Sequence, residues 1–199
     1  MSSEQAREAP AAPSKHRRNA AATREAILHS ALVAFTRSGY PGVGVREIAQ
    51  AAGVTAMLVN RYFGSKERLF AEAVEAAFAK RELLTDDAAT LSRDVAVALV
   101  AQTEAEPVDG FLLMLRSASD ERAAEILRDS IERHFERHLA ALLPGAAANE
   151  RAAVFLSVIA GFKLMRNVLG GTALAAADAT ALSRRLEAVF GLLMEDQAP

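Results

Sequence analysis

The chain of 199 residues contains no cysteine, few aromatic residues and no long apolar run. The lack of cysteine excludes disulfide scaffolds, thiolate nucleophiles, cysteine-ligated zinc and iron–sulfur clusters. The longest apolar stretch, from Ala152 to Phe162, is followed by Lys163 and Arg166 before it could cross a bilayer. Residues 1–18 lack the apolar segment of a signal peptide. We therefore expect a soluble cytoplasmic protein with no membrane partner.

The sequence also lacks the motifs of common enzyme active sites: it has no glycine-rich phosphate loop, no paired carboxylates and no nucleophile elbow. Of its four histidines, His134 and His138 are four residues apart in a segment with helical periodicity. That spacing allows two imidazoles to bind one metal ion, but no third ligand is close in sequence. We expect no metal, no other cofactor and no enzyme activity. A helical metal-dependent enzyme that uses these two histidines is the alternative.

Apolar residues make up 51% of the chain and charged residues 24%, enough for a substantial core. Apolar residues recur at helical spacing, and no stretch alternates with a period of two, so we expect an all-α fold of about nine helices. The first three helices follow Ala20, Gly44 and Thr55, and the breaks after them fall at Gly39, Gly53 and Gly64. The remaining helices are expected near residues 67–80, 88–103, 108–118, 121–142, 149–169 and 177–195.

Charge is distributed unevenly along the chain. Residues 1–70 hold ten Lys and Arg against five Asp and Glu, whereas residues 71–199 hold thirteen against twenty. A basic first third joined to an acidic remainder is typical of a head that binds a polyanion and a body that does not.

Residues 45–63 show the pattern of a helix-turn-helix: a short helix, a tight turn at Gly53 and a second short helix. Glycine permits the positive φ of the sharp reversal. We expect Ile48, Val54, Val59 and Phe63 to be buried, because they fix the angle between the helices. The other face of the second helix would then project into the major groove of DNA; it carries Met57, Asn60 and Arg61.

The segment VREIAQAAGVTAMLVNRYFGSKERLFAEAV resembles the DNA-binding segment of tetracycline-repressor-type (TetR) transcriptional regulators, and TREAILHSALVAFTRSGY resembles the first helix of that family. The resemblance implies an N-terminal three-helix DNA-binding domain, which we place at residues 20–66. A helical effector-binding and dimerisation domain is expected at residues 67–199. The chain departs from the family pattern at Gly44, where Ser or Thr is usual, and at Asn60 and Tyr62, where Tyr and His are usual.

Ten residues are candidates for contact with double-stranded DNA. Asn60 suits adenine, Arg61 suits guanine or phosphate, and Met57 offers an apolar surface to a thymine methyl group. The others are expected at the backbone or close to it, with Thr23 and Arg24 at the start of the first helix. The full set is Thr23, Arg24, Arg46, Thr55, Ala56, Met57, Asn60, Arg61, Tyr62 and Lys66.

Residues 1–19 contain two prolines and no apolar period, so we expect a disordered arm. Its basic cluster runs from Lys15 to Arg18. Such a cluster can enter the minor groove of adjacent DNA, or it can serve only to keep the chain soluble.

The resemblance also implies a homodimer, paired through the helices near 149–169 and 177–195, on a palindromic operator. A small apolar effector is expected to shift helix 67–80 and so to lower operator affinity. The aromatic and long apolar side chains most suited to its pocket are Phe111, Met114, Leu115, Phe135, Phe155 and Phe162. A third possibility is a ligand-binding helical module whose DNA-binding segment is degenerate.

Overall fold

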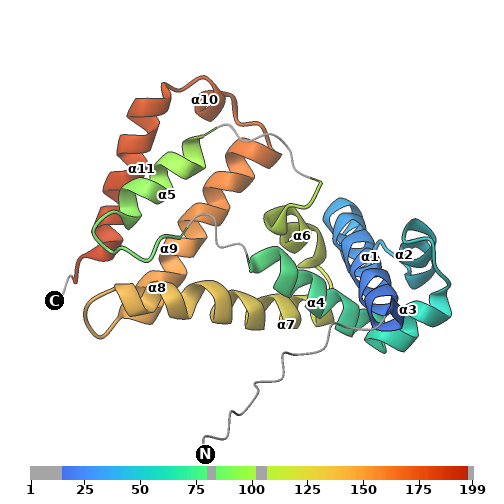
Figure 1. The fold of residues 1–199 in the computed structure, drawn as a ribbon. Helices are drawn as coiled ribbons and strands as arrows, with labels where there is room; N and C mark the ends of the chain where they lie inside the picture. Colours follow the sequence, from blue (N-terminus) through green and yellow to red (C-terminus); the bar gives the residue numbers. More distant parts are fainter. Residues whose placement is uncertain (1–14, 80–83, 102–106, 197–199) are drawn as a thin grey trace, which may run out of the picture.

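The computed structural model describes residues 15–79, 84–101 and 107–196, and within these ranges every regular element is a helix (Figure 1). The all-α prediction is thereby confirmed. The helices are α1 (Lys15–Ser38), α2 (Val45–Ala51), α3 (Ala56–Phe63), α4 (Lys66–Phe78), α5 (Leu91–Val100), α6 (Gly110–Ser117), α7 (Glu121–Ile131), α8 (Arg137–Leu142), α9 (Ala148–Lys163), α10 (Thr172–Ala175) and α11 (Ala179–Met194).

Two π-helical turns extend this list. The first, η1 (Glu132–Glu136), joins α7 to α8, so that the helix predicted at 121–142 is continuous. The second, η2 (Leu164–Val168), prolongs α9. The short helix α10 was not predicted, because it lies between the helices expected near residues 149–169 and 177–195.

The predicted arm is wrong over its last five residues, because α1 begins at Lys15 and not at Ala20. No glycine or proline separates Lys15 from Ala20, and lysine, arginine and alanine are good helix formers, so the helix continues back to this point. Residues 1–14 lie outside the described residues.

The predicted breaks at Gly39 and Gly53 are confirmed, with φ of +69° and +68°. Gly39 also permits a close approach between helices, since a Cβ there would lie 2.2 Å from the carbonyl oxygen of Arg116 in α6. Ser65 caps α4: its hydroxyl accepts a hydrogen bond of 3.2 Å from the backbone N–H of Arg68.

The buried apolar residues form two cores. The first joins α1–α4 to α6 and α7, with Phe35, Tyr40 and Phe70 packed together and Leu113 and Leu127 contributed by α6 and α7. The packing of the DNA-binding segment therefore continues past residue 66.

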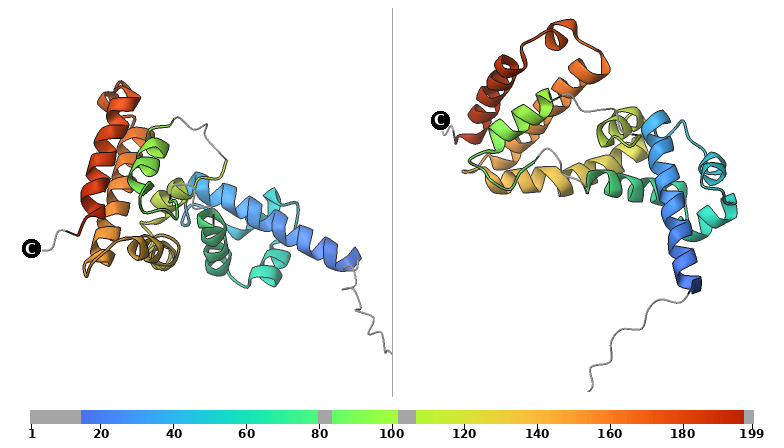
Figure 2. Two further views of the ribbon diagram at one scale, coloured as in Figure 1. Left: turned by 60° about the vertical axis from the view of Figure 1, so that its left-hand side comes forward. Right: turned by 45° about the horizontal axis from the view of Figure 1, so that its top comes forward.

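The second core lies between α5, α8, α9 and α11. Phe155 and Phe190 stack inside it with ring centroids 4.3 Å apart. Phe135, half-buried in η1, packs against both cores. Figures 1 and 2 place α2 and α3 at one end of the molecule and α5, α9 and α11 at the other, with α7 and α8 running between them. Across the described residues, none of the helices combines the length and the apolar character needed to traverse a bilayer.

Candidate nucleic-acid interface

The short helices α2 and α3 meet at a tight turn held by backbone hydrogen bonds. The N–H of Gly53 donates to Gln50 over 3.1 Å, and the N–H of Val54 donates to Ala49 over 2.9 Å. Ile48, Val59 and Phe63 are buried as predicted, and Val54 is half-buried. The two helices are thus fixed to each other and to α1 and α4 as one unit.

The outward face of α3 is exposed, as predicted. Met57 is 80% exposed, and Asn60 and Arg61 are also exposed. A methionine so open to water has no role in the core of this chain, and it shares its face with an amide and a guanidinium, both donors to base edges and phosphates. Neither Arg61 nor Arg46 of α2 forms an ion pair with any residue of the described ranges.

The first turns of α2 and α3 retain unsatisfied N–H groups. Gly44 and Thr55 are the N-caps, with extended backbone, and neither supplies a side-chain hydrogen bond. The N–H groups at a helix start favour anions, so both turns are suited to DNA phosphates. Ala56 and Tyr62 flank this surface and are half-buried.

Lys66 begins α4, which follows directly on α2 and α3; we call these two helices the recognition unit. Its ammonium lies 4.1 Å from the centroid of the Tyr40 ring, a cation–π contact. Burial lowers the pKa of Lys66, while the nearby carboxylates of Asp120 and Glu67 act in the opposite direction. The ring therefore holds the cation close to the body of the protein.

Thr23 and Arg24 do not lie at a helix N-terminus, and this part of the prediction is wrong. Because α1 begins at Lys15, both residues lie about two turns inside it. The Thr23 hydroxyl donates to the carbonyl oxygen of Asn19 over 2.8 Å. Arg24 pairs with Glu72 of α4, and its guanidinium lies 4.7 Å from the ring centroid of Phe63. Arg24 thus ties α1 to α3 and α4.

The structure places the six candidate effector residues in several parts of the molecule. Phe155 is fully buried in the second core, and Phe135 lies between the cores, 5.2 Å from the ring of Phe78. Phe111 lies beneath Lys163 at 5.0 Å, and Phe162 lies beneath Arg166 at 5.8 Å.

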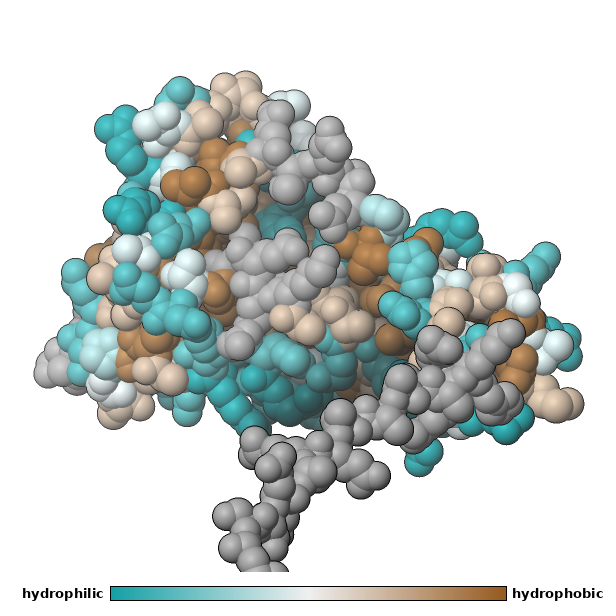
Figure 3. Space-filling view, in the orientation of Figure 1, coloured by the Kyte–Doolittle hydropathy of each residue, from teal (hydrophilic) through white to brown (hydrophobic). Residues whose placement is uncertain are grey.

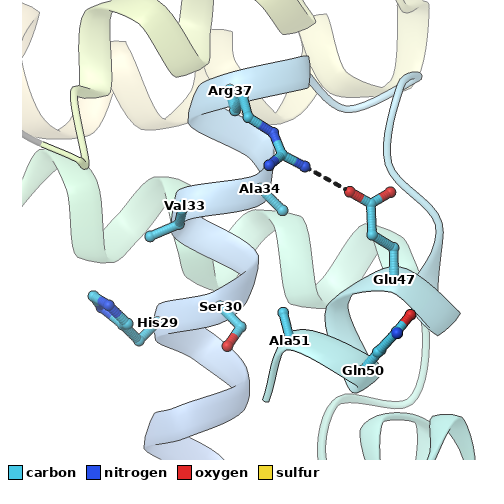
Figure 4. A pocket seen from close by; sticks show the side chains of 8 residues that line it. All are labelled: His29, Ser30, Val33, Ala34, Arg37, Glu47, Gln50 and Ala51. Atoms are coloured by element: carbon cyan, nitrogen blue, oxygen red, sulfur yellow. Dashed lines mark hydrogen bonds and ion pairs between the residues drawn. The ribbon is translucent and has the colours of Figure 1, made fainter. Parts of the chain in front are cut away.

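Met114 lines a shallow hollow of about 260 Å³ between α6 and α7, with Ile131 and Glu136 among its neighbours. Leu115 is half-buried on α6. A wider hollow of about 520 Å³, which the sequence did not indicate, crosses α1 and α2 between His29 and Ala51 (Figure 4). The ion pair of Arg37 with Glu47, 2.8 Å long, bridges it.

The two histidines at metal-binding spacing contact different carboxylates. The Nε2 atom of His134 lies 2.8 Å from Oε2 of Glu75, and that of His138 lies 3.2 Å from Oδ1 of Asp86. Across the described ranges, no three His, Asp or Glu side chains come together as a metal site would require. The geometry gives the metal-enzyme alternative no support.

The outer face of α9, η2 and α11 exposes apolar side chains at the positions expected for dimerisation. Each of them is at least 40% exposed, and the set is Val154, Met165, Val168, Leu169, Val189 and Leu192. Ser157 and Gly161 lie exposed between Val154 and Met165, so two small residues separate the large ones along α9 and η2.

Sequence reasoning missed the polar contacts that join helices distant in sequence. Arg116 of α6 donates to the carbonyl oxygen of Thr36 over 2.5 Å, and the backbone N–H of Tyr40 donates to the Ser117 hydroxyl over 2.9 Å. These partners are 77 to 80 residues apart, so no local pattern could have indicated them.

Comparison with known proteins agrees with this geometry. Residues 27–73 match a family model described as "Bacterial regulatory proteins, tetR family", and residues 89–191 match "Tetracyclin repressor-like, C-terminal domain". The crystal structure of NalD, from Pseudomonas aeruginosa, has the same fold, with a TM-score of 0.62 at 22% identity over 90% of this chain and 100% of NalD.

Two relatives are similar in sequence. The transcriptional regulatory protein RaaS of Mycobacterium tuberculosis is 33% identical over 143 residues, which are 68% of this chain and 66% of RaaS. The transcriptional regulator BetI of Agrobacterium fabrum is 38% identical over 77 residues, 39% of this chain and 32% of BetI. The chain thus spans just under two thirds of the first relative and about a third of the second. Because the C-terminal family model alone matches more than half of its residues, the chain belongs to the tetR family of regulatory proteins.

Proposed function

We propose that the chain is a DNA-binding transcriptional regulator that acts in the bacterial cytoplasm as a homodimer on a palindromic operator. The observation that carries this proposal is the exposed face of α3, where Met57, Asn60 and Arg61 stand on a rigidly packed unit. RaaS and BetI, which are similar to this chain over 143 and 77 residues, are both named as helix-turn-helix regulators.

The proposed contacts divide into base edges and backbone. Asn60 reads adenine, Arg61 reads guanine or binds a phosphate, and Met57 packs on a thymine methyl group. The DNA backbone is contacted by the free N–H groups in the first turns of α2 and α3, which follow Gly44 and Thr55. The side chains placed near it are those of Arg46, Ala56, Tyr62 and Lys66.

Selection of bound sequences from random duplex DNA tests this proposal. We expect a palindrome whose half-sites lie about one helical turn apart, 34–36 Å. Replacing Arg61 by Ala should weaken binding by roughly 1–3 kcal/mol per contact and relax one base position. The control is Arg93→Ala, an arginine that is also exposed to solvent but lies on α5. A protein that selects no sequence would be a helical ligand-binding module with a degenerate DNA-binding segment.

The length of DNA that must be recognised is the reason for proposing a homodimer. One recognition helix reads too few base pairs to select a site in a genome, and a two-fold pair doubles the footprint. The apolar outer face of α9, η2 and α11 supports pairing there, because its small residues allow a close approach.

Introducing a charge on this face tests the assignment. Leu192→Asp should convert the dimer to a monomer in sedimentation experiments and reduce binding to the full palindrome. Val97→Asp is the matched control, because Val97 is an apolar residue 54% exposed on α5, compared with 59% for Leu192. Dissociation by the control alone would place the interface elsewhere.

We further propose that a small apolar effector releases the protein from DNA. The hollow beside Met114 lies between α6 and α7, and α7 packs along α4, which is joined directly to the recognition unit. NalD, similar in fold, is described as a repressor of an efflux pump, and repression is the outcome proposed here. A compound that binds and raises the melting temperature of the protein should lower its affinity for the operator. A compound that raised the operator affinity would instead be a co-repressor.

A further inference from the structure

Glu75, in the second half of α4, accepts hydrogen bonds from three side chains of one neighbouring helix. The Ser130 hydroxyl donates to Oε1 over 2.7 Å, and Arg133 donates to both carboxylate oxygens over 2.7 and 3.2 Å. The Nε2 atom of His134 lies 2.8 Å from Oε2. We call these four residues the Glu75 cluster.

The cluster is a specific contact and not a chance surface pairing. Ser130, Arg133 and His134 are spaced i, i+3 and i+4, so they lie on one face of α7 and η1. Ser130 is 1% exposed, and its hydroxyl also accepts a bond of 3.2 Å from Arg133. Burial raises the pKa of Glu75, but the bonds from Arg133, His134 and Ser130 outweigh it and lower the pKa to about 2. The carboxylate is therefore ionised and fully engaged at neutral pH.

The cluster lies far along α4 from the recognition unit, so a change in the angle of α4 at the cluster displaces that unit. α4 starts at Lys66, just after α3, and Glu75 lies about 14 Å further along the axis at 1.5 Å per residue. Beyond the cluster, Phe78 packs edge-on against Phe135 of η1. Hydrophilic residues cover the lower centre of the face in Figure 3, where α7 runs. The apolar side chains of α4 and α7 pack together in the first core, and the Glu75 cluster adds directional polar bonds between the two helices.

We propose that Glu75 is a positioning residue for DNA binding: the Glu75 cluster fixes the angle of α4 on α7 and thereby the separation of the two recognition helices in the dimer. This inference rests on the proposed palindrome and dimer. A small rotation of α4 at the cluster moves α3, at its far end, across the face of the duplex. Separation matters because both heads must reach half-sites a fixed distance apart.

The two helices provide their own control. Near the start of α4, Glu67 pairs with Arg122 of α7 over 3.2 Å, and the Arg122 side chain is 76% exposed. Like the Glu75 cluster, this pair joins a glutamate of α4 to an arginine of α7 or η1. Ser65 and Tyr40, the other hydrogen-bond partners of Glu67, lie outside α7. On α7 the pair therefore has a single exposed arginine, and exposed ion pairs contribute little. Arg122→Ala should therefore leave DNA binding unchanged.

The test compares three duplexes for the full-length protein and its variants. The first is the palindrome that the wild-type protein selects from random DNA. The second is the same palindrome with its half-site spacing changed by one or two base pairs, and the third is a single half-site measured at low salt. Glu75→Gln should weaken binding to the palindrome roughly 5-fold to 20-fold, within the usual range of coupling between sites. It should also reduce the preference for the selected spacing, and leave the affinity for the single half-site unchanged.

Each outcome decides a separate point. A wild-type protein that selects no palindrome overturns the proposed function, whatever the variants do. If the wild-type protein selects one, a Glu75→Gln variant with an unaltered spacing preference overturns the positioning role. Equal losses on the half-site and the palindrome also overturn it, because they indicate damage to the head itself. Should Glu75→Gln not fold, Ser130→Ala removes a single donor and is expected to show the same change in spacing preference, to a smaller extent.

Discussion

The two cores of the molecule are closed in different ways. In the first, polar contacts cross between helices: Tyr40 to Ser117, Arg116 to Thr36 and the Glu75 cluster. The second is a layer of apolar side chains centred on the stacked rings of Phe155 and Phe190. The first core carries a surface of donors at α3, whereas the second leaves apolar side chains exposed on α9 and α11. One end thus suits a polyanion and the other suits a protein surface.

Around the second core, arginine side chains donate hydrogen bonds to carbonyl oxygens at the ends of helices. Arg166 donates to the carbonyl oxygens of Leu99 and Val100, over 3.0 and 2.9 Å, where α5 ends. Arg151 donates to the carbonyl oxygen of Glu195 over 2.8 Å and to that of Pro144. A cation at a helix C-terminus satisfies open carbonyls and opposes the negative end of the helix dipole. The polar contacts of this core therefore lie at its rim.

The largest loss of stability is expected in the second core, whose interior is held together by the packing of apolar side chains. Phe190 is fully buried, so Phe190→Ala should lower the free energy of unfolding by about 3–5 kcal/mol. Denaturant titration followed by circular dichroism measures this. Hydrogen exchange should show lost protection in α5 and α11 before α1–α3. Val189→Ala, one position away and 43% exposed, should cost far less within one subunit. Equal loss of protection in both regions would show that the cores unfold together.

A smaller loss is expected from the polar contacts of the first core. The Ser117 hydroxyl is buried and accepts the backbone N–H of Tyr40. Ser117→Ala leaves that N–H unsatisfied, at a cost of about 1–3 kcal/mol. The control is Ser119→Ala, an exposed serine two residues away. Thermal unfolding measures the difference between them, and equal melting temperatures would show that the hydrogen bond from Tyr40 to Ser117 contributes nothing to stability.

Local sequence signals predicted the first core's framework well. The glycines at 39 and 53 have positive φ because the chain reverses there, and Ser65 caps α4 by accepting the backbone N–H of Arg68 three residues on. Such signals depend on interactions within a few residues, and so they do not depend on how the rest of the chain folds. The face of α3 was predictable for the same reason, because burying Val59 and Phe63 determines which residues turn outward.

Contacts between distant residues could not be predicted. Glu75 and Arg133 are 58 residues apart, and Arg24 and Glu72 are 48 apart, so each pairing depends on the completed fold. Arg24 is the instructive case: it was expected at the start of the first helix, yet α1 begins at Lys15, and Arg24 pairs with Glu72 of α4. The start of α1 was misplaced because residues 15–19 were grouped with the prolines before them.

Acid should weaken the Glu75 cluster selectively. The pKa of Glu75 lies at about 2 in the folded chain and at its ordinary 4.5 when unfolded. The cluster's contribution is therefore complete above about pH 5 and is lost as pH falls towards 2. The Glu75 side chain is 38% exposed, so solvent screening reduces this contribution to about 1 kcal/mol. The stability difference between wild type and Glu75→Gln should shrink over this pH window, and a constant difference would contradict it.

The smallest effect is expected at Gly44, and it bears directly on what the DNA-binding end is built for. Gly44 caps α2 with φ of −99° and ψ of 149°, and a Cβ there would meet no atom within 4 Å. Serine fits this geometry and supplies an acceptor for the first turn, so Gly44→Ser should raise stability by a few tenths of a kcal/mol. Gly44→Ala, which adds the Cβ without the oxygen, should not. If the open N–H groups of α2 bind phosphate, the serine hydroxyl competes for them, and the variant should be more stable yet bind DNA more weakly. An increase in both stability and affinity would show that α2 contacts the backbone through Arg46 and not through its first turn.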